Sequence, residues 1–186
     1  ATDTDYYAAQ VMNYRLGGGG FASQLTQQLR EGKGYTYGVG SRFNGNANTG
    51  SFVISSGVRS NVTYEASSLV KEILQNYGSN FNENDLEISK GYMIKSNARA
   101  FETMGSKLGM LRNISTYNYP DNYAKLQEQS VKNMSVEDIK ALATTYIHPD
   151  KMIYLVVGDA KTQLKKLNKL GYGEPLLLNP EKPLKD

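Results

Sequence analysis

Cysteine is absent from this sequence, and histidine occurs once, at His148. Without cysteine the chain can form no disulfide, no thiolate zinc site and no iron–sulfur site, and it has no thiol nucleophile. A catalytic zinc needs two or three imidazole or carboxylate ligands at fixed spacing, and the chain contains neither HExxH nor the inverted form HxxEH. We therefore expect no metal site and no cofactor in this chain, and we expect His148 to lie at a helix end.

Long apolar runs and a strong charge imbalance are missing as well. No stretch approaches the roughly 18 apolar residues of a membrane helix, so we expect a soluble chain with no membrane span. The net charge of +3 is small, and no basic stretch interleaved with aromatic residues accompanies it, so nucleic acid is not an expected partner. The sequence does not decide the compartment; a bacterial periplasm or cytoplasm is the expectation.

The first half of the chain changes from helical spacing to alternation. Apolar residues recur at helical intervals over residues 3–16 and 21–30, which predicts two amphipathic helices separated by the glycines at 17–20. Residues 35–43 then alternate in polarity, and an Asn/Gly-rich turn at 44–50 leads into a second alternating segment at 51–58. This pattern predicts an antiparallel hairpin.

Helical periodicity dominates the rest of the chain, with predicted helices at 63–78, 86–98, 101–114, 120–133, 135–146 and 162–170. The apolar run at 152–157 is too short for a helix and predicts a buried central strand. Residues 173–186 contain three prolines and are expected to form an extended tail.

This order of elements predicts one α+β domain over residues 1–186, with helices packed on one face of a mainly antiparallel sheet. Three strands would be few for so many helices. Either further strands escape detection, or the opening strands of the domain precede Ala1.

Four short motifs in the first 37 residues carry a family resemblance. They are Leu-Gly-Gly-Gly at 16–19, Ser-Gln-Leu at 23–25, Leu-Arg-Glu at 29–31 and Lys-Gly-Tyr-Thr-Tyr at 33–37. In order and spacing they resemble the second, inactive domain of the M16 metallopeptidases. This is the family of pitrilysin-like, insulinase-like and mitochondrial-processing-peptidase-like enzymes. Two later segments also fit the pattern of this family: Ser-Val-Glu-Asp at 135–138, and the stretch from Pro149 to Asp159. Gln24 departs from the pattern, because many members carry Arg there.

The resemblance implies the fold of one M16/LuxS-like metallohydrolase half. It also implies a division of labour: a companion half holds zinc through HxxEH, and the inactive half supplies an Arg and a Tyr that bind the substrate backbone near the scissile bond. Arg30 and Tyr37 match that pair. The glycines Gly17, Gly18, Gly19 and Gly20 match a segment that touches substrate in some members. The implied partners are thus a zinc-bearing half and a peptide or unfolded polypeptide, and no catalytic activity is expected from this chain alone.

Other interpretations stay open. Arg30 could simply neutralise a helix end, and Tyr37 could be a core aromatic residue. Gly17, Gly19 and Ala22 satisfy a dinucleotide-binding pattern, but a helix precedes them instead of a strand, which disfavours that interpretation. At the level of the protein, the alternatives are a structural subunit of M16 fold and a peptide-binding module that uses the hairpin edge.

Overall fold

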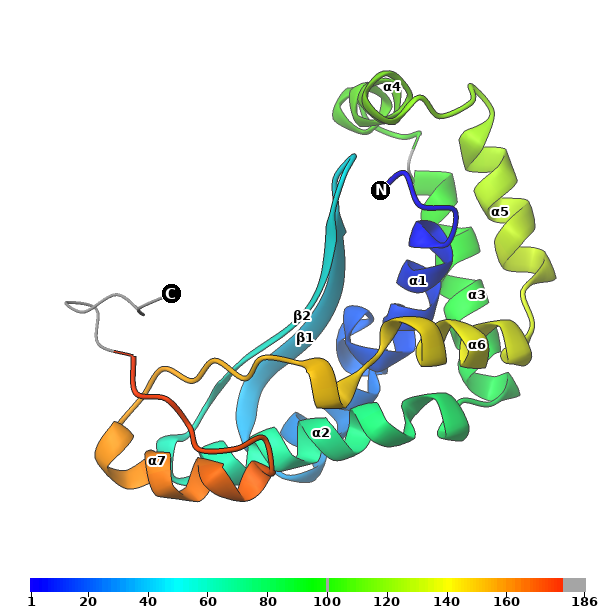
Figure 1. Cartoon of the computed structure of the whole chain (residues 1–186). Coiled ribbons are helices and arrows are strands. Elements are labelled where there is room, and N and C mark those ends of the chain that lie inside the picture. Colours follow the sequence, from blue (N-terminus) through cyan, green and yellow to red (C-terminus); the bar gives the residue numbers. More distant parts are fainter. Residues whose placement is uncertain (100, 179–186) are drawn as a thin grey trace.

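The computed structural model describes residues 1–99 and 101–178. Strands β1 (Thr36–Gly45) and β2 (Gly50–Val58) form an antiparallel hairpin, and the helices gather on one side of it (Figure 1). The first α-helix is α1 (Tyr6–Asn13). The others are α2 (Thr63–Asn80), α3 (Glu83–Arg99), α4 (Met104–Tyr117), α5 (Tyr123–Asn133), α6 (Val136–Tyr146) and α7 (Ala160–Leu167). The predicted α+β architecture is confirmed.

The hairpin forms where alternation and turn residues predicted it. Phe43 lies opposite Phe52 in the strand register, and their ring centroids are 4.7 Å apart. Such a cross-strand aromatic pair stabilises a hairpin and fixes its register. At the turn, the side-chain oxygen of Asn46 accepts hydrogen bonds from the amides of Asn48 and Thr49, each at 2.8 Å. The turn is therefore closed by its own side chain.

The two predicted N-terminal helices are more irregular than expected. The first becomes α1 followed by a π-helical turn, η1 (Tyr14–Gly18). The second is divided into a 3₁₀ turn, η2 (Gly20–Ala22), and a π-helical segment, η3 (Thr26–Gly32). A π turn is wider than an α turn and shifts the faces that later residues present. Here it accompanies the burial of Leu16 and Gly17.

The hydrophobic core joins the helical layer to the hairpin. Tyr77 of α2 is fully buried, and its hydroxyl donates to the carbonyl oxygen of Met12 at 2.6 Å, so the phenol satisfies its polar group inside the core. Burial raises the pKa of Tyr77 far above its ordinary value. The remaining fully buried side chains of this core include Val11, Leu16, Leu25, Leu29, Phe81, Val131 and Ile139.

The prediction of a buried central strand at 152–157 is wrong for the described residues. This segment is extended but pairs with neither β1 nor β2, and the described sheet has two strands. Ile153 and Val157 are each 94% exposed, whereas Met152, Tyr154 and Val156 are half-buried. The physical reason is distance, because a groove of about 520 Å³ separates the segment from β2.

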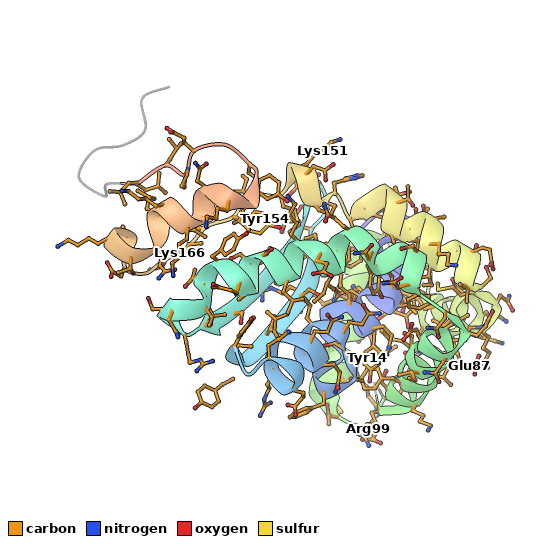
Figure 2. All side chains as sticks on the ribbon, turned by 90° about the horizontal axis from the view of Figure 1, so that it is seen from below. Tyr14, Glu87, Arg99, Lys151, Tyr154 and Lys166 are labelled. Atoms are coloured by element: carbon orange, nitrogen blue, oxygen red, sulfur yellow. The ribbon has the colours of Figure 1, made fainter. Side chains whose placement is uncertain are left out.

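That groove is lined by residues of β2, by one face of α2 and by the extended segment. Figure 2 shows Tyr154, from this segment, beside α2. The Tyr154 ring stacks on that of Tyr172, with centroids 5.0 Å apart. No described residue pairs with the outer edge of β2 or with the backbone of 153–157, so both can accept a strand. Of the predicted C-terminal tail, residues 173–178 lack regular secondary structure, and 179–186 lie outside the described residues.

Candidate functional site

Arg30 lies in the last turn of η3, with Leu29 buried beneath it. The Arg30 side chain is 38% exposed. Two backbone hydrogen bonds close this turn just before β1 begins: the Gly34 amide donates to the Arg30 carbonyl at 3.0 Å, and the Tyr35 amide donates to the Leu29 carbonyl at 2.8 Å. Gly34 has φ +60°, a left-handed conformation in which glycine is favoured. The glycine turn thus fixes the position of Arg30 relative to the strand.

Tyr37 projects into solvent from the start of β1, and its side chain is 93% exposed. Alternation alone would place it on the same face as Tyr35 and Val39, which are half-buried. The strand register explains the difference. Thr36 pairs with Val58, but Val39 pairs with Ser56, so β1 carries one extra residue in this interval. This β-bulge reorients Tyr37, and the interpretation of Tyr37 as a core aromatic residue is wrong.

Hydroxyl groups from both strands hold the bulge. The Thr36 hydroxyl accepts from the Gly38 amide at 3.0 Å and lies 2.7 Å from the Gly57 carbonyl oxygen, to which it can donate. The Ser56 hydroxyl is 3.0 Å from both the Thr36 hydroxyl and the Gly38 carbonyl. Sequence reasoning missed Thr36 and Ser56. The available signal was Gly38 directly after Tyr37, since glycine inside a strand pattern often marks a bulge.

The four glycines of the glycine-rich segment differ in their surroundings. Gly17 is buried against β1, and a Cβ added there would lie 2.3 Å from the Ser41 hydroxyl oxygen and 2.6 Å from the Ser41 amide nitrogen. Gly18 and Gly20 are exposed, Gly19 is half-buried, and Gly20 has φ +55°. Gly17 therefore serves close packing, and the glycines that a second molecule can reach are Gly18 and Gly20.

An ion pair anchors the end of this segment to α3. Arg15 lies 2.7 Å from Asp85, and both side chains are largely buried. The Arg15 guanidinium also donates to the carbonyl oxygen of Ala22, two residues after the last of these glycines. A guanidinium that bridges a carboxylate and a carbonyl uses several of its fixed N–H directions at once. Arg15 therefore ties the glycine-rich segment to the helical layer.

The described part of the chain does not fit a metal site. No group of three or more His, Cys, Asp or Glu side chains in it could hold a metal ion. His148 is exposed and follows the end of α6, as predicted. Near Arg30, the closest carboxylate is that of Glu31, with an oxygen 3.4 Å from the Arg30 Nε. Both side chains are well exposed, so this pair holds Arg30 only weakly.

The site therefore presents hydrogen-bond donors from Arg30 and Tyr37. Arg30 and Tyr37 lie at the two ends of one short helix-to-strand connection, and the glycine-rich segment lies before the same helix. Residues 1–92, which include all of these features, match the family described as peptidase M16 inactive domain. Over these residues, about half of its length, the chain belongs to that family. No curated protein sequence matches it.

Solved structures of this M16 fold resemble the chain over most of its length. The crystal structure of a peptidase M16 inactive domain from Pseudomonas fluorescens is 29% identical, with a TM-score of 0.72 over 81% of this chain and 36% of that one. A protease from Helicobacter pylori (TM-score 0.70, 79% and 35% covered) and the periplasmic protease PqqL from Escherichia coli (TM-score 0.62, 76% and 15% covered) are each 19% identical, which shows the shared fold. This M16 domain spans about a third of the first two solved chains.

No helix among the described residues of this M16 domain is both long and apolar enough to cross a membrane.

Proposed function

We propose that this M16 domain is the substrate-binding, non-metal half of a zinc-dependent endopeptidase. Arg30 and Tyr37 hold the peptide backbone near the scissile bond, and a companion half with HxxEH supplies the metal. The observation that supports this proposal most directly is the exposure of Tyr37 at a hydroxyl-braced bulge, beside a helix end that presents Arg30. Bulges often re-aim side chains at functional sites.

The chemistry of the two side chains suits a peptide carbonyl. Arginine stays protonated and offers five N–H donors in one plane, and the tyrosine hydroxyl adds another donor. Donors that are already in place when negative charge develops on a carbonyl oxygen favour the transition state over the substrate. The chain's own residues would therefore bind and orient the peptide, and no bond-breaking step is assigned to them.

The test needs the complete enzyme with its zinc half. We expect Arg30→Ala or Tyr37→Phe to lower kcat by about 10²- to 10³-fold, the usual effect of removing one such donor, with unchanged zinc content. Arg42→Ala is the matched control. It removes an exposed arginine from β1, the strand that carries Tyr37, and should leave kcat unaltered. Full activity of both site variants would refute the proposal.

A second candidate is a non-catalytic subunit of M16 fold that binds peptides or supports an assembly. The free outer edge of β2 favours it, because an exposed edge can add a strand from another chain. The two candidates differ in what accompanies the domain. If neither the remaining coding sequence nor a neighbouring gene encodes HxxEH, the structural candidate prevails.

The groove between β2 and the extended segment suggests a further part of the domain. We propose that opening strands, which precede Ala1 in a longer protein, occupy this groove and complete the sheet. Ala1 lies at the hairpin turn, where its amino group donates to the Asn46 carbonyl at 2.8 Å. A strand that leads to Ala1 would run toward this turn, antiparallel to β2, and could pair with β2 and with residues 153–157.

Hydrogen exchange tests this arrangement. In a protein that includes the residues encoded before Ala1, the amides of residues 153–157 should exchange more slowly than in the 186-residue chain. Equal exchange rates in the two proteins would contradict it.

As for compartment, the name of the Escherichia coli neighbour favours the periplasm for the complete protein, which cell fractionation can check.

A further inference from the structure

Phe21 places its ring against the guanidinium of Arg30. The Cζ of Arg30 lies 4.6 Å from the centroid of the Phe21 ring. Phe21 is 61% exposed, so its main role is not to fill the core. A guanidinium over an aromatic face at this distance forms a favourable cation–π contact. This contact joins the glycine-rich segment to the proposed substrate-binding arginine.

The backbone on both sides of Phe21 is held firmly. The Gln27 side-chain amide donates to the Phe21 carbonyl at 2.6 Å, and Arg15 donates to the carbonyl of Ala22. On the preceding side, the Ser23 hydroxyl donates to the Gly20 carbonyl at 2.7 Å. Three consecutive carbonyls, from Gly20 to Ala22, are thus satisfied by side chains. These hydrogen bonds fix the backbone that carries the Phe21 ring, although the ring itself is exposed.

A guanidinium that meets a ring through its face keeps its donors available. All five N–H bonds lie in the guanidinium plane and point outward from it, away from a ring stacked on the face. Arg30 also lies near Glu31 in the same structure, with its Nε 3.4 Å from a Glu31 carboxylate oxygen, so this exposed pair accompanies the Phe21 contact and uses at most one N–H direction. A contact of this kind with Phe21 orients Arg30 and keeps the terminal N–H donors available for a peptide carbonyl.

We propose that Phe21 is a positioning residue for Arg30, an aromatic platform that preorganises its guanidinium to bind the substrate backbone. The inference rests on the proposed function of Arg30. An exposed arginine side chain has much rotamer freedom to lose when it binds, and a platform that restricts it beforehand lowers this loss. Phe21 acts through Arg30 and forms no bond to the reacting atoms.

One test uses this chain alone and does not depend on activity. In nuclear magnetic resonance spectra, the ring current of Phe21 should shift the side-chain signals of Arg30 upfield. Phe21→Leu keeps the apolar volume but removes the π face, and should abolish the shift, whereas Phe21→Tyr should retain it. Phe101→Leu, which changes another exposed phenylalanine, is the matched control and should leave the Arg30 signals in place. Unshifted Arg30 signals in the unaltered chain would overturn the inference.

The second test measures kcat and KM in the complete enzyme. We expect Phe21→Leu to lower kcat/KM about two- to fivefold, the effect of losing an exposed cation–π contact, and Phe21→Tyr to restore it. In combination with Arg30→Ala, Phe21→Leu should have no further effect, because its only route to the substrate is through Arg30.

The outcomes separate the two proposals. If Arg30→Ala leaves activity intact, the proposed role of Arg30 in substrate binding fails, and the positioning role of Phe21 fails with it. If Arg30→Ala lowers activity but Phe21→Leu does not, only the positioning role fails. A loss from Phe21→Leu that is equally large with and without Arg30→Ala also overturns the positioning role, because Phe21 would then act on the substrate by itself.

Discussion

Asn13 and Ser41 hold each other through two hydrogen bonds in the buried contact between α1 and β1. The Asn13 Nδ2 donates to the Ser41 carbonyl at 2.8 Å, and the Ser41 hydroxyl donates to the Asn13 Oδ1 at 2.5 Å. Both residues are buried. Because α1 leads into the glycine-rich segment and β1 carries Tyr37, this pair fixes two parts of the proposed site relative to each other.

Removing either partner should destabilise the fold. Asn13→Ala or Ser41→Ala leaves a buried polar group without its partner, which costs about 1–3 kcal/mol of unfolding free energy. Urea denaturation measures this change, and the double variant should lose less than the sum of the single variants, because they share one interaction. Asn44→Ala, an exposed change further along β1, is the control. Strict additivity would show that the two residues do not interact.

Gly17→Ala should be strongly destabilising. Its Cβ would meet the backbone nitrogen of Ser41 at 2.6 Å, and backbone atoms cannot move aside as a flexible side chain can. Overpacking of this kind costs about 1–3 kcal/mol. Gly109→Ala, in α4, meets nothing within 4 Å and should instead be neutral or stabilise by up to about 1 kcal/mol through helix propensity. Similar melting temperatures for the two variants would contradict the close packing at Gly17.

The Arg15–Asp85 ion pair predicts an asymmetry between single and double changes. Asp85→Ala leaves the mostly buried Arg15 guanidinium without its carboxylate, which we expect to cost about 3 kcal/mol. Arg15→Met combined with Asp85→Leu replaces both charges by apolar groups and should cost clearly less than Asp85→Ala alone. Chemical denaturation of the three variants gives the comparison. A double variant that is as unstable as Asp85→Ala would contradict this account.

Asp138 should contribute stability that disappears in acid. Hydrogen bonds from the Ser135 amide and hydroxyl, both at 2.8 Å, hold the pKa of Asp138 below its ordinary value of 3.8. A carboxylate whose pKa is lower in the folded state stabilises the fold above its unfolded pKa, and this contribution is lost as the pH falls through the folded pKa. Asp138→Asn should therefore cost about 0.5–1 kcal/mol at pH 7, a typical capping contribution, and progressively less as the pH falls below 3.8.

Glu137→Gln changes a neighbouring exposed acid in the same first turn and serves as the control. Its effect on the unfolding free energy should be smaller at pH 7. If Asp138→Asn destabilised the protein equally at pH 7 and pH 3, the hydrogen-bonded carboxylate would not be the cause.

Several elements were predictable because their causes are local. Ser135 and Asp138 are three positions apart, the spacing of a capping box, and α6 begins there with both hydrogen bonds in place. Alternation on both sides of an Asn/Gly-rich turn predicted the hairpin, whose strands at 36–45 and 50–58 agree closely with the expected ranges. In each case, residues within one or two turns of each other supply the whole signal.

Other features depend on partners far away in the sequence. Alternation places Tyr37 on the half-buried face of β1, but pairing with β2 introduces a bulge that turns it outward. The apolar run at 152–157 reads as a buried strand, yet its backbone is paired with neither β1 nor β2. Periodicity describes what a segment prefers, and it carries no information about whether a partner is present at the right distance.

The sequence by itself determined the α+β composition, the hairpin, the caps and the family resemblance that singled out Arg30 and Tyr37, since spacing and residue chemistry are properties of the chain alone. Only the tertiary structure decided that Tyr37 faces solvent, that Phe21 lies against Arg30 and that Gly17 packs on Ser41. These facts arise from contacts between segments whose relative placement is set by the shared core, and no local pattern encodes that placement.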